Sequence, residues 1–326
     1  SRSGHVRVYQ NNNGTWVQVG SDIDGETAGD QSGTSVSLSS DGSIVAIGAW
    51  TNNDNGTSSG HVRIYQNING TWTQIGSDID GEAAFDYSGW ATSLSTDGKT
   101  IAVGAPTNGG NGASSGHVRI YKNINGTWTQ IGSDIDGEAS GDRSGQSVSL
   151  SSDGNTVAIG AYLNGNSSQG QVRVYQNVNG VWTQIGSDID GVNAMDRLGN
   201  SVSLSSDGKT LAIGAYLNDG NGTDAGDVKV LRNVNGSWRQ IDSTIDGEAS
   251  GDQFGYSVLL SSNGRTLVIG GPGNDGNGAE AGHVRVYSLC NTFSTDTIIS
   301  CNSYTWTDSI TYTTGNTTAK DTFVNV

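Results

Sequence analysis

The sequence has few of the features that anchor or cross-link a chain. Only two cysteines, Cys290 and Cys301, occur in its 326 residues, and both lie near the C-terminus. The repeat region before them needs no disulfide for its fold, and two cysteines alone leave open whether this late pair is bridged. No run of 18 or more apolar residues is present, so we expect no transmembrane helix in this chain.

Positive charge is also scarce. The chain has 16 Lys and Arg against 32 Asp and Glu, which gives a net charge of -16. This balance argues against nucleic acid or an anionic membrane surface as a partner, because both need a basic binding face. Hydrophobic residues make up 33%, whereas there are 50 glycines. This composition favours short strands joined by tight turns over helices.

A repeat of about 56 residues organises what is present. His5, His61 and His117 are each 56 residues apart, and the equivalent Gln171, Asp227 and His283 follow at spacings of 54, 56 and 56. The chain opens at SRSGHVRVY, which corresponds to the middle of the loop TSSGHVRIY in the next copy. We therefore expect the chain to be part of a larger polypeptide.

Each complete copy contains four strand patterns. In the second copy they cover residues 91–95, 100–105, 117–121 and 127–132. Asp97-Gly98 and Asn125-Gly126 are preferred two-residue hairpin turns, so neighbouring strands should be antiparallel. The second strand, TIAVGA, is nearly all apolar or small, and we expect it to be buried on both faces.

The predicted fold is all-β: a β-propeller whose blades are the four-stranded repeats. Five repeats fit in the chain, so either five blades form the ring or they are part of a six- or seven-bladed ring. In the five-bladed alternative, the segment around Trp16 supplies the fourth strand of the last blade and closes the ring. We assign residues 1–288 to the propeller and residues 289–326, which are rich in Thr and Ser, to a separate β-like module or linker.

The repeat resembles the FG-GAP repeat of integrin-type β-propellers. The matching motifs are Gln253–Val258 around Phe254-Gly255, together with Val103–Pro106 and Ile269–Pro272. The similarity covers residues 4–287 and is greatest to bacterial and algal repeats with an I-D-G-E-A-x-G-D signature. The resemblance implies a propeller, often with seven blades, that serves binding and adhesion outside the cell. Residues 301–306 resemble Cys-x-Ser-Tyr-x-Trp repeats near the C-termini of large secreted, surface-attached bacterial proteins.

The chain departs from the calcium-binding members of that family. In those proteins the hairpin between the first and second strands is a long loop rich in Asp and Asn, whereas here it is Ser-Ser-Asp-Gly. Ca²⁺ prefers six to eight oxygen ligands, which a two-residue turn does not present.

An acidic D-x-D-x-E connection follows the fourth strand in three copies and provides a second place where Ca²⁺ could bind. In the other two connections, Val192 replaces the Glu and Thr244 replaces the first Asp. Alternatively, these residues shape the turn through hydrogen bonds to the backbone, and repetition in every blade favours that structural role. The candidate metal ligands are Asp22, Asp24, Glu26, Asp30, Asp78, Asp80, Glu82, Asp86, Asp134, Asp136, Glu138 and Asp142.

Aromatic residues distinguish some copies from others. In a propeller, the loops between the second and third strands share a rim with the connections into the next blade, and such loops are where binding residues gather. Aromatic rings beside Asn and Asp could stack on sugars, or else pack between blades. The candidate ligand-binding residues are Trp50, Phe85, Tyr87, Trp90, Tyr162 and Tyr216.

No G-x-S-x-G motif, zinc-ligand spacing or phosphate-binding loop occurs. All four histidines occupy one repeat position, so we interpret them as polar residues at a strand edge and expect no catalytic role. The sequence favours a non-enzymatic extracellular module, secreted or on the cell surface, that binds a protein or glycan ligand. The two alternatives are a polysaccharide-active enzyme that uses carboxylates at the rim and a structural spacer in a large surface protein.

Overall fold

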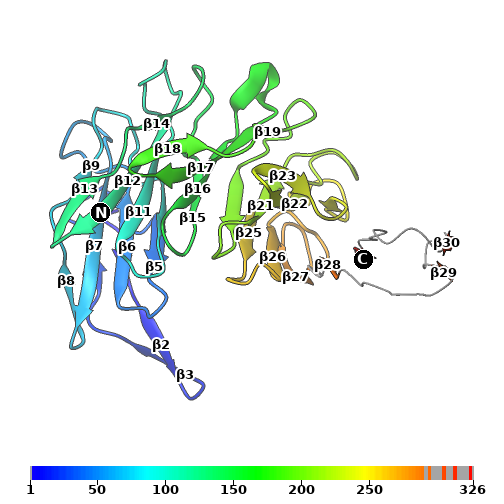
Figure 1. The fold of residues 1–326 in the computed structure, drawn as a ribbon. Coiled ribbons are helices and arrows are strands. Elements are labelled where there is room, and N and C mark those ends of the chain that lie inside the picture. The colour runs from blue at the N-terminus through cyan, green and yellow to red at the C-terminus, as the bar shows by residue number, and fades with distance from the viewer. Residues whose placement is uncertain (1, 290–292, 295–302, 306–310, 314–322, 325–326) are drawn as a thin grey trace. The chain divides into compact units, whose positions relative to one another are not determined.

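The computed structural model describes residues 2–289, 293–294, 303–305, 311–313 and 323–324 (Figure 1). Contacts within the chain divide it into two units, Ser1–Tyr287 and Ser288–Val326. Cys290 and Cys301 lie outside the described residues, as do residues 302 and 306 of the segment on which the second resemblance rests.

Four complete blades have the same construction: four antiparallel strands in chain order, with a fifth, two-residue strand on the third strand. The first has β5 (Ser35–Leu38), β6 (Ile44–Ala49), β7 (His61–Ile68), β8 (Thr71–Gln74) and β9 (Ile79–Asp80). The second has β10 (Ala91–Leu94), β11 (Thr100–Ala105), β12 (His117–Ile124), β13 (Thr127–Gln130) and β14 (Ile135–Asp136). The third has β15 (Ser147–Leu150), β16 (Thr156–Ala161), β17 (Gln171–Val178), β18 (Val181–Gln184) and β19 (Ile189–Asp190), with one π-turn, η1 (Asn164–Ser168), between β16 and β17. The fourth has β20 (Ser201–Leu204), β21 (Thr210–Ala215), β22 (Asp227–Val234), β23 (Ser237–Gln240) and β24 (Ile245–Asp246).

The remaining strands precede the four complete blades in the chain, follow them as a fifth blade, or belong to the second unit. The fifth blade has three strands, β25 (Ser257–Leu260), β26 (Thr266–Gly271) and β27 (His283–Ser288). The N-terminal segment has the outer strands of a blade, β1 (His5–Val6), β2 (Tyr9–Asn12), β3 (Thr15–Gln18) and β4 (Ile23–Asp24). Among the described residues of the second unit, β28 (Phe293–Ser294) pairs with β31 (Phe323–Val324), and β29 (Ser303–Thr305) pairs with β30 (Thr311–Thr313).

The all-β fold and its five-bladed propeller arrangement are therefore as predicted. The order of the strands within each blade also follows the sequence pattern, because tight turns join neighbouring strands. All six residues of β11 are buried, as expected for an apolar second strand between two neighbours. The short fifth strand was not expected: Ile135 and Asp136 pair with Val118 and His117 at the start of β12.

The hydrophobic core lies between the blades. One cluster joins Val62 and Ile64 of β7 to Ile101 and Val103 of β11, and all four side chains are at most 1% exposed. Equivalent clusters fill the next two interfaces. Burying an aliphatic side chain of this kind contributes about 1.5–3 kcal/mol, so each blade depends on its neighbours for most of its stability.

A tryptophan in the fourth strand links each complete blade to the preceding one. Nε1 of Trp128 donates a hydrogen bond of 2.8 Å to the carbonyl oxygen of Ile75. Trp72, Trp182 and Trp238 donate equivalent bonds of 2.8–3.0 Å. Gly76 has a φ of +75° and lies against the indole of Trp128, so that a Cβ there would approach Cδ1 to 2.8 Å. The glycine in each TWTQIG segment therefore makes room for the tryptophan of the next blade.

Serine residues link the innermost strands. The hydroxyl of Ser93 accepts a 2.9 Å hydrogen bond from the amide of Leu150 in the next blade, and Ser37, Ser149 and Ser203 act in the same way. The backbone amide of Thr96 also donates to the carbonyl of Ser152, as part of a series from Ser40 to Ser262. The Val-Ser-Leu alternation thus places serine toward the next blade rather than toward solvent.

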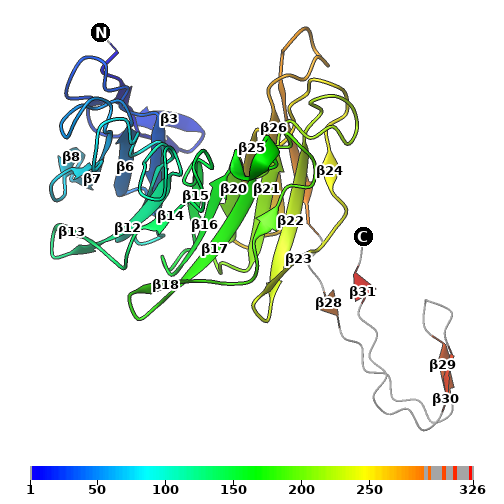
Figure 2. The same cartoon turned by 90° about the horizontal axis from the view of Figure 1, so that it is seen from above.

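The first and fifth blades are at the two ends of this series, and Figure 2 shows them as the blue and orange sheets. In the described part of the chain, no backbone bond joins Ser262 to Ser40, and Leu259 stands in blade 5 where the other blades have the linking serine. The closure considered for the five-bladed alternative, in which the segment around Trp16 joins the last blade, is not observed: β3 pairs with β2, across the Asn13-Gly14 turn. A local hairpin costs less loop-closure entropy than a pairing with the distant β27.

We expect Trp128→Phe to lower the free energy of unfolding by about 1–3 kcal/mol, because the carbonyl of Ile75 loses its partly buried donor. Urea denaturation followed by circular dichroism measures the change. Trp16→Phe is the matched control: this side chain is 66% exposed, and its replacement should change stability by less than about 0.5 kcal/mol. Equal effects of the two substitutions would contradict the role assigned to the inter-blade bond.

Candidate functional site

The loop between the second and third strands and the connection into the next blade lie together at one rim. Parallel bridges join them, for example Gly60 with Ser88 and Gly116 with Ser144. The predicted ligand and metal residues come from these two segments or flank them.

The last Asp of each acidic connection holds a turn. The carboxylate of Asp86 is 3% exposed and accepts hydrogen bonds from the backbone amides of Glu82 and Ala83 and from the side chain of Asn108. Asp30 and Asp142 accept equivalent bonds from the amides of Thr27 and Ala139. These contacts are those of the structural alternative, in which Asp shapes the turn.

The first Asp of each connection binds a glutamine at the end of the fourth strand. Oδ1 of Asp78 accepts a 2.5 Å hydrogen bond from Gln74, and Asp134 accepts one of 2.6 Å from Gln130. Asp22 accepts one from Gln18 and in addition pairs with Arg7 at 2.8 Å, and this hydrogen-bonded ion pair lowers the pKa of Asp22 to about 2.

The second Asp and the Glu contact an arginine of the following blade. The backbone carbonyl of Asp80 accepts a 2.6 Å hydrogen bond from Arg119, while Glu82 lies 3.5 Å from the same guanidinium. Asp24 with Glu26, and Asp136 with Glu138, meet Arg63 and Arg173 in the same way. Burial raises the pKa of Asp80 and of Asp136, and the neighbouring Asp78 and Asp134 raise them further.

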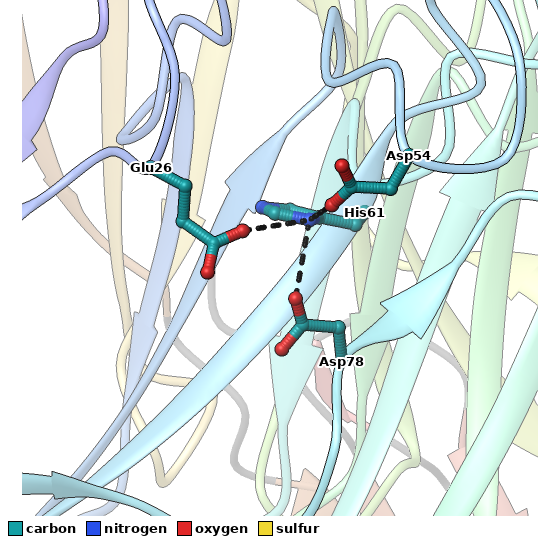
Figure 3. Close-up of side chains that lie close together, drawn as sticks. All are labelled: Glu26, Asp54, His61 and Asp78. Carbon is teal, nitrogen blue, oxygen red and sulfur yellow. Dashed lines mark ion pairs between the residues drawn. The ribbon is translucent and has the colours of Figure 1, made fainter.

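Residues from two successive acidic connections meet around a histidine. Nδ1 of His61 lies 4.0 Å from Glu26, 3.7 Å from Asp54 and 3.6 Å from Asp78, as Figure 3 shows. The group therefore combines Glu26 from the connection before the blade with Asp78 from the connection after it, whereas Asp22 and Asp24 lie elsewhere. Sequence reasoning missed Asp54 and His61. Asp54 could have been found by comparing copies, because the corresponding positions of the loops between the second and third strands in blades 2, 4 and 5 are occupied by glycine.

Two of the histidines that we predicted to lie at a strand edge, His61 and His117, are buried at the start of a strand, whereas His5 is exposed. His61 and His117 are 0% and 1% exposed, because each begins a third strand that is covered by both neighbouring blades. Burial lowers the pKa of His117 to about 4, so its imidazole is neutral at pH 7. His117 lies 3.9 Å from Glu82 and 3.6 Å from Asp134, which gives a second, three-membered group.

Later copies change this group: the third blade replaces only the histidine, and the fourth blade replaces all three members. In the third blade Gln171 replaces histidine and donates a 3.0 Å hydrogen bond to Glu138. In the fourth blade Asp227 takes this position, and Val192 and Thr244 replace the surrounding Glu and Asp. Three carboxylates would repel one another where histidine is lost, so the replacements keep the local charge balanced.

Three of the predicted aromatic residues form one cluster. The ring of Trp50 lies 4.7 Å from that of Tyr87 and 5.0 Å from that of Trp90, in edge-to-face geometry. Trp50 begins the loop after β6, while Tyr87 and Trp90 belong to the connection into β10. Phe85 comes from the same connection and is 56% exposed.

Phe85 is held in an unusual backbone conformation. Its φ is +66°, a left-handed value that bulky residues seldom adopt, and three copies have glycine at this position: Gly29, Gly141 and Gly251. The backbone of Phe85 is fixed on both sides, since its amide donates to the carbonyl of Thr57 and its carbonyl accepts from the hydroxyl of Thr107. In the fourth copy Met195, with the same φ, is exposed at the equivalent position.

The two remaining predicted aromatics, Tyr162 and Tyr216, surround a cation. Their rings lie 5.8 Å and 5.7 Å from the guanidinium of Arg197, which also donates a hydrogen bond to the hydroxyl of Tyr216. The ring of Tyr256 lies 5.3 Å from Tyr216. These rings already have protein partners, as in the packing alternative. Arg197 and Tyr256 were not predicted, although they stand at the repeat positions of Tyr87 and Trp90 in the second copy.

Two hollows lie away from the aromatic cluster. One, of about 160 Å³, is lined by the ends of all five innermost strands, including Leu38, Leu150 and Leu260, and thus lies at the propeller axis. The other, of about 300 Å³, lies between blades 2 and 3 and is lined by Asp134 and Trp182 among others. Trp182 is a blade-linking tryptophan, so we attribute the second hollow to the packing of the blades.

The fold defines the protein as an all-β propeller of antiparallel sheets. Comparison with protein families matches residues 22–65, 189–231 and 244–287 to the FG-GAP repeat. The chain carries FG-GAP repeats, so the resemblance to this repeat that we inferred from the sequence is confirmed over these three stretches. A comparison with curated proteins finds no match. Among the described residues, none forms a helix that is long and apolar enough to cross a membrane.

Asp227 predicts a pH dependence of stability. Its side chain is 4% exposed, and burial raises its pKa to about 7, with Asp196 and Asp246 raising it further and Lys229 opposing the change. Because the folded pKa is above the unfolded value of about 3.9, the folded state binds more protons between these pH values. The contribution of Asp227 to stability is therefore greatest below about pH 4 and falls as pH rises through about 7.

Asp227→Asn should remove this loss and raise the free energy of unfolding at pH 8 by a few kcal/mol, on the order set by a shift of several pKa units. Urea denaturation at pH 5 and pH 8 measures it. Asp207→Asn, in an exposed turn of the same blade, is the control for general charge effects. A pH dependence of stability unchanged by Asp227→Asn would exclude a buried, protonated Asp227.

Proposed function

We propose that the propeller is a non-enzymatic binding module, secreted or on the cell surface, that holds a glycan against the rim of blades 1 and 2. The observation that carries this proposal is the aromatic cluster of Trp50, Tyr87 and Trp90 with the exposed Phe85 beside it. Carbohydrate is the ligand class that fits such a surface, because the C–H faces of sugars stack on aromatic rings.

The strained backbone at Phe85 supports a role in binding. A left-handed conformation costs a non-glycine residue about 1–2 kcal/mol, and glycine in three other copies avoids that cost. Here the cost is combined with the exposure of a large apolar ring, so the fold gains nothing evident from phenylalanine. Strain that persists at an exposed residue is typical of positions kept for a ligand.

Rigidity of the cluster also favours binding. Trp50, Tyr87 and Trp90 are half-buried, and each contacts another ring. Phe85 is anchored through its backbone to Thr57 and Thr107. A ligand therefore meets rings whose conformational freedom has already been reduced, which lowers the entropic cost of association.

The enzyme alternative has weaker support at the carboxylates that it would use. Asp86 and Asp196 are 3% and 2% exposed, and their carboxylates accept backbone hydrogen bonds. Both are thus engaged in turn formation rather than presented to a substrate at the rim. The spacer alternative predicts that the aromatic rim has no ligand at all.

A glycan array identifies the ligand, and calorimetry with that glycan then compares variants. Phe85→Gly should weaken binding at least about tenfold, because anchoring aromatics contribute about 2 kcal/mol or more. The same variant should keep or gain stability, since glycine relieves the left-handed φ. Trp90→Gln, which installs the residue found at position 146, should also weaken binding.

Met195→Gly is the matched control. It relieves the same backbone strain in the fourth copy but lies outside the proposed site, so it should leave glycan affinity unchanged. Wild-type affinity in Phe85→Gly would contradict the site. Capture of a protein partner with no glycan bound would favour a protein ligand, release of reducing sugar from a bound polysaccharide would favour the enzyme, and failure to bind any ligand would favour the spacer.

A further inference from the structure

The ring nitrogens of His61 are buried and lack hydrogen bonds. Its side chain is 0% exposed, and neither Nδ1 nor Nε2 makes a hydrogen bond in the described structure. Leaving a buried polar atom unpaired costs about 1–3 kcal/mol. Nδ1 points into the group of Glu26, Asp54 and Asp78, whose nearest oxygens are 3.6–4.0 Å away (Figure 3). These distances are too long for hydrogen bonds.

The spacing of the four ligand atoms fits a shared cation. All lie within 4.8 Å of one another. Ligand atoms about 2.0–2.2 Å from a tetrahedral metal ion are roughly 3.3–3.6 Å apart, so only a small contraction would bring these atoms into coordination. The Glu26 and Asp54 side chains are 41% and 54% exposed, which leaves the group open to ions from solvent.

The charges of the group also fit a divalent ion. Glu26, Asp54 and Asp78 supply three negative charges, and Arg63, 3.3 Å from Glu26, supplies one positive charge. With neutral histidine the sum is -2, which a divalent cation cancels. Asp80 adds a further carboxylate next to the group, because it is paired with His61 across β7 and β9. A bound cation would oppose the mutual repulsion of these carboxylates.

Asp54 makes this group different from its counterparts. The equivalent loop positions of blades 2, 4 and 5 are Gly110, Gly220 and Gly276. The group around His117 consequently has two carboxylates and one arginine, Arg119, and would leave a divalent ion with excess positive charge. The repeat thus provides a site with four ligands in blade 1 and a natural three-ligand comparison in blade 2.

We infer that Glu26, Asp54, His61 and Asp78 bind one divalent transition-metal ion, with Zn²⁺ as the ion that tests the site. Imidazole nitrogen together with carboxylate oxygen suits Zn²⁺ and its neighbours in the first transition row. Ca²⁺ and Mg²⁺ prefer oxygen ligands alone, and a buried imidazole aimed at the site is a poor match for them.

The metal would connect three parts of the rim. Glu26 belongs to the connection before blade 1, Asp54 to its second-to-third-strand loop, and Asp78 to the connection after β8. Asp54 itself is positioned by a hydrogen bond from its amide to the side chain of Asn52, which is 1% exposed. Binding should therefore stabilise the folded state, with thermal denaturation shifting upward as Zn²⁺ concentration rises.

The test is calorimetric titration of the chelator-treated full chain with ZnCl₂. Wild type should bind one ion with a saturable isotherm, and His61→Gln and Asp54→Gly should weaken that binding by at least about tenfold. His117→Gln should leave it unchanged. Gln and Gly are natural residues at the equivalent positions of blades 3 and 2, so both variants should fold, and circular dichroism checks this.

Two further readouts separate this site from a charged surface. Co²⁺ should give visible absorption bands in wild type that are lost in His61→Gln, and CaCl₂ in excess should not displace Zn²⁺. Absence of saturable Zn²⁺ binding would overturn the inference. It is the result expected if His61 only forms ion pairs with the carboxylates around it. Equal losses in His61→Gln and His117→Gln, or binding of Ca²⁺ that His61→Gln does not affect, would also overturn it.

Discussion

Packing of one blade against the next is the constraint on which the structure depends. A four-stranded sheet of this size cannot bury both of its apolar faces by itself, so residues such as Ile64 and Ile101 become buried only where two blades meet. Directional bonds set the spacing: Trp128 reaches the carbonyl of Ile75, and Ser93 accepts from Leu150. The residues that recur in every copy are largely those that make these contacts.

Because the recurring residues mainly build the blades and their interfaces, they are poor guides to function. Asp86 and its equivalents form turns, although they are candidate metal ligands in the sequence, and the recurring tryptophans link the blades. The positions that differ between copies are more informative. Phe85 replaces glycine despite its left-handed φ, and Asp54 replaces glycine beside a buried histidine. Both changes depart from what blade construction requires, and both lie in segments that the fold brings to one rim.

The rim also shows how a propeller makes sites from distant segments. Glu26, Asp54, His61 and Asp78 span 53 positions of sequence, yet their ligand atoms lie within 4.8 Å of one another. The parallel bridge between Gly60 and Ser88 holds the second-to-third-strand loop against the connection into the next blade. The same juxtaposition brings Trp50 to Tyr87 and Trp90, so the proposed glycan surface and the proposed metal site both follow from one architectural contact.

The sequence by itself determined the repeat, the four strands of each blade, their order and the propeller class, because hairpin turns and strand periodicity are local properties of the chain. The tertiary structure alone decided which residues meet. It grouped Glu26 with Asp78 rather than with Asp22 and Asp24, and it buried His61, since these outcomes depend on the stacking of successive blades. It also kept β3 on β2 instead of on the last blade. Such contacts join residues far apart in the chain, and local patterns carry no information about their distances.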